Sequence, residues 1–275
     1  GKILKKPVLV TYDEFLGERW YEVINNLWIA KISKFIEAAI AKLDFDKYVA
    51  ISTSTASDLI ANHLDPQKIS VIYPGIETEK IAASIHSEEL REIYRKELSI
   101  LGTSFVYLFF GRPGATKGAE YLIQAYSQIT QEIPDSHLIM ILSKSPKKGY
   151  DQILKSIDEL KAHNIHILPP FPSRKDLFSF IYIADCIVIP SLTVGFGLAV
   201  VESNILGIPV VATKAGSIPE VISGKYVLVE RKSPEAISDG VFKVYNNDYS
   251  TSLLKDFNWD ESVDQYETIY QELLK

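Results

Sequence analysis

The sequence alternates between short apolar runs rich in β-branched residues and longer segments whose apolar residues have a helical spacing. Most of the short runs are apolar at successive positions, which is typical of parallel strands covered on both faces. A strand–helix–strand alternation predicts a doubly wound α/β sheet. The runs that predict strands are 7–11, 48–52, 69–73, 105–110, 137–142, 165–168, 186–190, 209–213 and 226–230.

The distribution of these runs predicts two α/β units of unequal size. Three runs precede the Pro-Gly turn at Tyr73-Pro74-Gly75-Ile76, and six follow it. Six strands suffice for a complete Rossmann-like domain, whereas three make about half of one. We therefore expect an incomplete first unit at 1–74, a complete second unit at 75–257 and a terminal helix at 258–275.

Residues 27–43 predict a helix whose apolar residues share one face. Three lysines accompany Trp28 and Phe35, a combination compatible with docking on a membrane surface. A helix packed on its own sheet explains the same pattern, and this is the interpretation that we favour. The apolar face consists of Trp28, Ile32, Phe35, Ile36, Ala39 and Leu43.

Composition limits the classes of function. The net charge of −6 argues against a broad nucleic-acid-binding surface. Cys186 is the single cysteine, so no disulfide forms within the chain and a reducing compartment is indicated. No apolar stretch approaches the length of a membrane span, and residues 1–7 lack the apolar core of a signal peptide. We expect a soluble cytoplasmic protein, with peripheral membrane contact as the alternative.

A strand end, a glycine-bearing loop and a helix start lie together at 190–202. Backbone N–H groups at a helix N-terminus, which a ligand approaches closely because Gly195 and Gly197 lack side chains, favour an anion such as a diphosphate. Glu202 follows inside the helix, where its carboxylate can accept hydrogen bonds from sugar hydroxyls. A tight strand–helix turn with a solvated glutamate explains this stretch equally well.

A second stretch, at 109–118, adds two cations at the carboxyl end of a strand. Open α/β sheets bind ligands at that edge. Arg112 can hold a phosphate through two parallel hydrogen bonds, and Lys117 adds a point charge. Isolated cations are usually surface charges, so this hypothesis depends on the first stretch. The spacing does not fit a P-loop, because Thr116 stands where that motif needs glycine.

Together these stretches resemble the retaining GT-B glycosyltransferases of glycosyltransferase family 4, also called glycosyl transferases group 1. The resemblance implies two Rossmann-like domains, the N-terminal one incomplete, and transfer of a sugar from a nucleoside-diphosphate sugar, such as a UDP- or GDP-sugar, to an acceptor hydroxyl. The matching motifs are Gly111-Arg112…Lys117-Gly118, Pro190-Ser191…Gly195-Phe196-Gly197…Glu202 and Gly207-Ile208-Pro209-Val210-Val211-Ala212-Thr213…Gly216…Pro219-Glu220.

The resemblance also implies roles for individual residues. Arg112 and Lys117 would clamp the donor diphosphate in place of a metal ion, and Glu202 would hold the donor ribose. The loop at 170–172 resembles the turn that binds the base, although a proline-rich loop before a helix explains it as well. The residues implied to line the donor site are Gly111, Val194, Gly195, Phe196, Gly197, Leu198, Phe171, Pro172 and Leu177.

The chain departs from the family pattern at three points. Val194 stands where the family has a glutamate, eight positions before Glu202, that contacts the donor sugar. Asp13 stands at a strand end where many members carry a histidine beside the reaction centre. Its carboxylate can orient a hydroxyl or stabilise an oxocarbenium-like transition state, but the polar start of a loop explains it too. Family members also have several strands and a glycine-rich loop before the position of residue 7.

These departures leave alternatives open. The sequence is a fragment, or the gene is naturally shortened or split, or a homo- or hetero-oligomeric partner completes the first sheet and covers its strand edge. The function is sugar transfer to an unknown glycan, lipid-linked or protein acceptor, or the chain is a non-catalytic nucleotide-sugar-binding or scaffold protein derived from this fold. The Asp44-Phe45-Asp46 triplet, a metal-binding signature in another glycosyltransferase fold, lies in the wrong context here.

Overall fold

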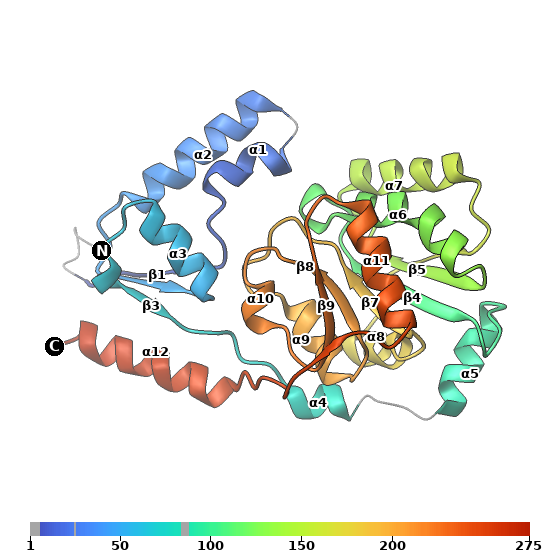
Figure 1. Cartoon of the computed structure of the whole chain (residues 1–275). Helices are drawn as coiled ribbons and strands as arrows, with labels where there is room; N and C mark the ends of the chain where they lie inside the picture. Colours follow the sequence, from blue (N-terminus) through green and yellow to red (C-terminus); the bar gives the residue numbers. More distant parts are fainter. Residues whose placement is uncertain (1–5, 25, 84–87) are drawn as a thin grey trace.

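Two β-sheets of unequal size organise the chain (Figure 1). The structure, a computed structural model, describes residues 6–24, 26–83 and 88–275, so residues 1–5 of the first expected unit lie outside the described part. Every strand expected from the apolar runs is present, with bounds within two residues of those expected. The predicted parallel α/β class is therefore confirmed.

The small sheet has three parallel strands in the order β1-β2-β3. Among the described residues β1 pairs only with β2, so its outer edge has no backbone partner there. The strands are β1 (Leu9–Tyr12), β2 (Lys47–Ala50) and β3 (Ile69–Val71). The connections contain η2 (Gly17–Arg19), α1 (Trp20–Val23), α2 (Leu27–Ala41), α3 (Thr53–Ala61) and η3 (Pro66–Lys68).

Helix α2 turns its apolar face to the outside, so the expectation that this face packs on the sheet is wrong. Trp28 is 75% exposed and Phe35 is 73% exposed, and the remaining large members of the face are exposed as well. The inward face is held by Glu37, whose carboxylate accepts hydrogen bonds from the backbone N–H groups of Leu16 (2.9 Å) and Gly17 (2.7 Å). Neither α2 nor any other helix in the described ranges is long and apolar enough to cross a bilayer.

The large sheet has seven strands in the order β10-β9-β8-β7-β4-β5-β6. Its parallel strands have the Rossmann order. From β4 the chain continues outward to β5 and β6 and then returns to β7 on the other side of β4, so the strand order reverses between β4 and β7. Only β10 is antiparallel to its neighbour. Both of its residues are exposed, so no apolar run in the sequence marks this strand. The strands are β4 (Phe105–Gly111), β5 (Ser136–Leu142), β6 (Ile165–Leu168), β7 (Cys186–Ile189), β8 (Val210–Thr213), β9 (Lys225–Val229) and β10 (Ser250–Thr251).

Helices cover both faces of the large sheet, and this explains why its strands are apolar at successive positions. In β4, Val106 and Leu108 belong to the core on one face, whereas Tyr107 and Phe109 belong to the core on the other. The helices of this unit are α4 (Thr78–Ala82), α5 (Glu88–Glu97), η4 (Ala115–Lys117), α6 (Ala119–Glu132), α7 (Lys147–Leu160), α8 (Arg174–Ile181), α9 (Leu198–Ile205), α10 (Ile218–Val221) and α11 (Pro234–Tyr245).

The chain crosses between the two sheets twice, and the crossings lie side by side. The backbone N–H of Ile76 donates to the carbonyl of Phe257 at 2.7 Å, which joins the outgoing segment to the returning one. Helix α12 (Trp259–Leu273) then runs along the small sheet (Figure 1). Its residue Ile269 is buried in one cluster with Val49 and Ile72.

A buried guanidinium ties α5 to the large sheet. Arg95 is 3% exposed and donates to the backbone carbonyls of Ile183, Gly102 and Ser104 at 2.8–3.1 Å. It also donates to the carboxylate of Asp185 at 2.8 Å. A buried charge is tolerated only when its hydrogen bonds are satisfied, so these contacts depend on one another.

Replacement of Arg95 by methionine should therefore lower the free energy of unfolding by about 3 kcal/mol, since several buried acceptors lose their donor. Lys96→Met, at the exposed neighbouring position of the same helix, is the matched control and should change it by less than about 0.5 kcal/mol. Urea unfolding measures both variants. Equal stability of the two variants would contradict this account of the network.

Candidate functional site

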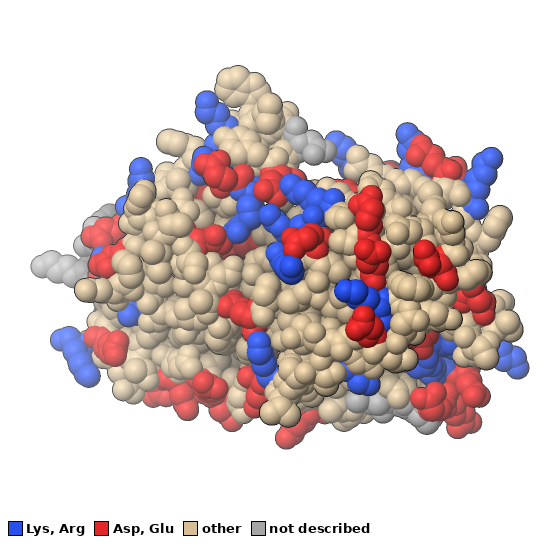
Figure 2. Space-filling model, viewed as in Figure 1, with Lys and Arg blue, Asp and Glu red and all other residues tan. Residues whose placement is uncertain are grey.

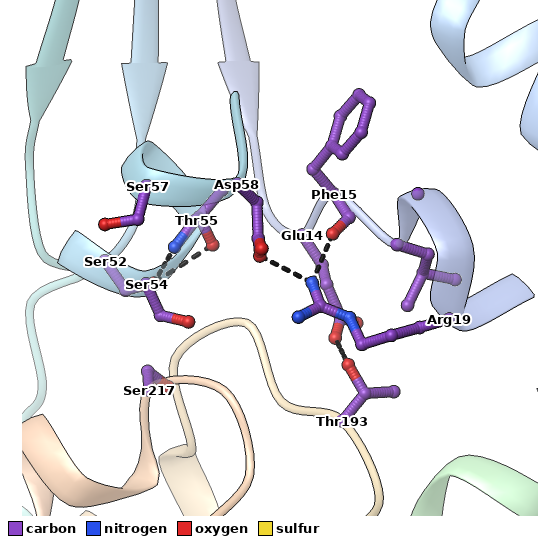
Figure 3. A network of polar contacts seen from close by, with 12 residues as sticks. Glu14, Phe15, Arg19, Ser52, Ser54, Thr55, Ser57, Asp58, Thr193 and Ser217 are labelled. Atoms are coloured by element: carbon purple, nitrogen blue, oxygen red, sulfur yellow. Dashed lines mark hydrogen bonds and ion pairs between the residues drawn. The ribbon is translucent and has the colours of Figure 1, made fainter. Parts of the chain in front are cut away.

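The carboxyl end of the small sheet lies beside loops of the large unit (Figure 3), and a cavity lined by residues of the crossings and of α8 and α9 opens near this junction. The segment after β1 contributes Glu14, whose carboxylate accepts a short hydrogen bond from the hydroxyl of Thr193. The start of α3 contributes the backbone N–H of Ser54, which donates to Glu220 of the large unit at 3.4 Å. Contacts between residues so far apart in the sequence fix the position of one sheet relative to the other.

The loop at 193–197 touches the small unit directly, and its glycines permit this. A Cβ atom on Gly195 would lie 1.9 Å from the carbonyl oxygen of Asp13, so any other residue would force the two units apart. Gly197 has φ +95° and is the N-cap of α9, a left-handed conformation that favours glycine. Val194 is 9% exposed and its carbonyl accepts a hydrogen bond from the backbone N–H of Ser217 at 3.2 Å.

The two predicted cations follow β4, next to the end of β7, where the strand order reverses. Arg112 is exposed, whereas Lys117 is half-buried in the η4 turn. Gly118 allows this turn to press against β7, because a Cβ there would lie 2.0 Å from the carbonyl oxygen of Pro190. Ligands of open α/β sheets bind in the crevice at such a reversal.

The electrostatics of Lys117 distinguish it from an ordinary surface lysine. Burial lowers the pKa of its ammonium, nearby Arg112 lowers it further, and Glu14 raises it. No ion pair or hydrogen bond from a described residue neutralises the Lys117 side chain. A desolvated cation held beside a second cation is a site prepared for an anion.

Glu202 and Leu198, both from α9, line an adjoining cavity of about 430 Å³ at the crossings between the units, together with Gly75 and Trp259. Glu202 is buried, and its carboxylate forms a short ion pair with Arg174 at the start of α8. Arg174 itself is mostly exposed, so a ligand that enters the cavity can exchange with it at Glu202.

The predicted base-binding loop lies before α8. The ring of Phe171 packs on Phe180 with centroids 4.8 Å apart, and Leu177 packs on the same core. Pro172 is exposed beside them. Phe171 and Leu177 therefore contribute to the core of the large unit, and the exposed surface of this loop is limited to Pro172 and its neighbours.

The structure puts Asp13 against Gly195 of the 193–197 loop, Lys117 within reach of the charge of the neighbouring Glu14, and Glu202 and Leu198 in the cavity at the crossings. Two contacts at this cleft escaped sequence reasoning, namely Glu14 with Thr193 and Arg174 with Glu202. No local pattern marks either pair, because each joins segments that only the tertiary fold brings together. The Asp44-x-Asp46 triplet lies elsewhere: Asp46 accepts from the backbone of Val8, and Asp44 pairs with Lys68.

Comparison with known sequences gives a consistent family. Residues 90–258, more than half of the chain, match the family described as glycosyl transferases group 1. An uncharacterized glycosyltransferase of Methanocaldococcus jannaschii is 26% identical over 262 residues, which cover 89% of this chain and 64% of that protein. D-inositol 3-phosphate glycosyltransferase of Corynebacterium glutamicum is 27% identical over 242 residues, which cover 82% of this chain and 57% of that protein. The chain thus spans between about half and two thirds of the length of such relatives.

Comparison with solved structures gives the fold. The structure of HepE of Anabaena in complex with UDP matches with a TM-score of 0.78 at 17% identity, covering 98% of this chain and 74% of that chain. Sucrose-phosphate synthase from Thermosynechococcus elongatus matches with a TM-score of 0.78 at 21% identity, covering 97% of this chain and 67% of that chain. The architecture is that of GT-B glycosyltransferases, as the sequence resemblance implied.

Because folding desolvates the Lys117 ammonium, Lys117→Met should raise the free energy of unfolding of the ligand-free protein, by about 1 kcal/mol near pH 7. The folded-state pKa is lowered, so the unfolded chain binds the proton more tightly and wild-type stability rises with pH. The gain should shrink as the pH rises from the lowered pKa of the folded state through the ordinary value of 10.5. Denaturant unfolding at about pH 7 and about pH 10 measures this difference in stability. Lys243→Met, at an exposed position of α11, is the control. A loss of stability at both pH values would contradict the interpretation.

Proposed function

This chain belongs to the glycosyl transferases group 1 family, and from this premise we propose that it binds a nucleoside-diphosphate sugar in the cleft between its sheets. The proposed reaction transfers the sugar to an acceptor hydroxyl with retention of the anomeric configuration and without a metal ion. One observation carries the proposal: where the order of the large sheet reverses, the turn that holds Lys117 is joined to the loop that leads into α9, since the backbone N–H of Leu192 donates to the carbonyl of Thr116 at 2.8 Å. UDP- and GDP-sugars are the proposed donors, and the UDP complex of HepE makes UDP-sugars the first to test.

In this proposal the diphosphate lies between the two cations and the N-terminal end of α9. The first amides of a helix have no partner within it, and they carry partial positive charge. Gly195 brings this loop into contact with the end of β1, and Gly197 gives it the left-handed turn from which α9 begins. Arg112 is exposed and free to adopt the geometry that a phosphate requires, whereas Lys117 is held in its turn. These groups stabilise the negative charge that develops on the departing nucleoside diphosphate.

The proposed ribose position is the cavity next to Glu202. A buried carboxylate there can accept hydrogen bonds from two adjacent hydroxyls, and these replace its contact with Arg174. Arg174 then becomes available to the phosphates or to solvent. Leu198, which is 46% exposed, separates this cavity from the glycine loop and offers an apolar surface to the nucleoside.

The acceptor is proposed to enter from the side of the small sheet, where Asp13 faces the glycine loop and the start of α3 faces Glu220 of α10. Asp13 is exposed, so its carboxylate is accessible to an acceptor hydroxyl or to the sugar. One observation favours a second function: Val194, which is apolar and buried, leaves its loop position without a carboxylate for the sugar. That function is nucleotide-sugar binding without turnover.

We further propose that additional polypeptide, rather than a lipid surface, covers the apolar face of α2. The outer edge of β1 has no backbone partner among the described residues, and its free N–H and C=O groups are a template on which a further strand can pair. Lipid cannot supply these hydrogen bonds. The curated relatives contain additional chain that could provide the strand and a covering helix, and a second subunit could do the same.

An exposed face of this kind should make the chain self-associate, because large apolar side chains in contact with water promote contact between copies. The double variant Trp28→Ser/Phe35→Ser should weaken self-association by about tenfold, as expected for two lost anchors. Leu253→Ser, at a 93% exposed position in the large unit, is the control. Light scattering over a concentration series measures the effect. A monomeric chain whose Trp28 fluorescence shifts on anionic vesicles would instead support a membrane surface.

Donor binding tests the main proposal. Titration calorimetry of the chain with UDP, GDP and their sugar conjugates should find at least one ligand. Arg112→Ala and Lys117→Ala should each lower the affinity for that ligand by about tenfold to a hundredfold, which is the contribution of a hydrogen bond to a charged group. Lys243→Ala serves as the control. Binding by the parent that neither variant weakens would contradict the proposed position of the diphosphate. Incubation of the bound donor with a panel of acceptors then separates transfer from binding alone.

A further inference from the structure

The carboxylate of Glu14 occupies a distinctive place in the cleft. It lies at the end of β1 but interacts with the large unit, where the hydroxyl of Thr193 donates to its Oε1 (Figure 3). Thr193 is 3% exposed and directly precedes Val194. The glycine loop therefore receives a carboxylate from the opposite sheet, next to a position where its own side chain is apolar.

The surroundings of Glu14 place it between the groups proposed to hold the donor. A Cβ on Gly195 would lie 3.4 Å from the Cβ of Glu14, so the base of the glutamate side chain borders the glycine loop. The negative charge of Glu14 also raises the pKa of the Lys117 ammonium, whereas burial and Arg112 lower that pKa and have larger effects. No described residue donates a hydrogen bond to the second oxygen, Oε2, and the residue as a whole is half-buried.

We propose that Glu14 binds hydroxyl groups of the donor sugar and is the sugar-recognising carboxylate of this cleft. The inference rests on the proposed donor site. If the diphosphate lies between Lys117 and the N-terminal end of α9, the attached sugar must lie against the glycine loop and the end of β1. Sugar hydroxyls need charged or strongly polar acceptors there, and Val194 provides none. In this arrangement Thr193 is a positioning residue that holds Oε1, and Oε2 accepts from the sugar.

Glu14 is distinguished from the other acidic residues of the same segment by its contacts. Asp13 presents its backbone carbonyl to Gly195, and its side chain is exposed. Glu18 is also exposed and forms an ion pair with Lys34 of α2, on the side away from the large unit. Of these three acidic residues, all of which lie in the described part of the chain, only Glu14 forms a side-chain hydrogen bond with the glycine loop.

The test compares affinities for a nucleoside diphosphate and for its sugar conjugate. Calorimetry with UDP and UDP-glucose, or with the tighter pair found in the donor panel, gives the ratio of the two dissociation constants. Glu14→Gln should leave the affinity for the nucleoside diphosphate within about twofold and reduce the affinity for the conjugate by about tenfold, because the charged acceptor is lost. Glu18→Gln, the matched control, should leave both affinities unchanged.

Two further variants separate recognition from a merely structural contact. Thr193→Val keeps the Glu14 carboxylate but removes its positioning bond, and it should give a smaller loss confined to the conjugate. Addition of Val194→Glu to Glu14→Gln should restore part of the lost affinity for the conjugate. Equal weakening of both ligands by Glu14→Gln, or no weakening at all, would overturn the inference while leaving the donor site intact. A parent chain that binds neither ligand would instead overturn the proposed function and this inference with it.

Discussion

Three aromatic rings fix the geometry on which the cleft depends. Tyr73 lies in the first crossing between the sheets, Phe257 in the second, and Phe196 in the glycine loop. The ring of Phe196 meets that of Phe257 edge to face at 5.0 Å, and the centroid of Tyr73 lies 5.5 Å from Phe257 and 6.0 Å from Phe196. Aromatic pairs of this kind contribute about 0.5–1.5 kcal/mol each beyond the area they bury. The cluster therefore couples the loop to both connections, and the relative position of the sheets sets the position of the loop.

A second set of contacts joins the two units at another point of their junction, away from these aromatic rings. Glu22 of α1 pairs with Lys232 at 2.9 Å and with Arg231 at 3.7 Å, and Arg231 donates to the carbonyl of Leu192 at 2.7 Å. The pairing with Lys232 is the main reason that the pKa of Glu22 is lowered. Figure 2 shows basic and acidic side chains together over the region where the two units meet. Partly exposed pairs contribute little stability each, so their role here is to select one orientation of the units.

Much of the fold was predictable from the sequence because the large sheet is buried on both faces. Strands such as β4 and β5 are continuous apolar runs, and the order of the motifs along the chain carried the family resemblance. The outward orientation of the apolar face of α2 was not predictable. The apolar residues of this helix, which Asn26 caps, have the same spacing whether a sheet or other material covers them. The contacts of Glu14 and Arg174 were not predictable either. They depend on how two units meet, and no local spacing encodes that arrangement.

The site itself illustrates a conflict between stability and binding. Lys117 is half-buried beside Arg112 and forms no direct ion pair with a described residue, and Glu202 is buried with an exposed arginine as its partner. Both arrangements cost free energy in the ligand-free protein, and a diphosphate with its ribose would satisfy both at once. The central claim is therefore about where these two parts of one ligand lie.

A crystal structure of the chain with a bound nucleoside diphosphate tests that claim most directly. We expect the phosphates between Lys117 and the N-terminal end of α9, and the ribose hydroxyls on Glu202 in place of Arg174. A nucleotide bound instead in the cavity between α6 and α7, which Gln152 and Lys155 line, would contradict it.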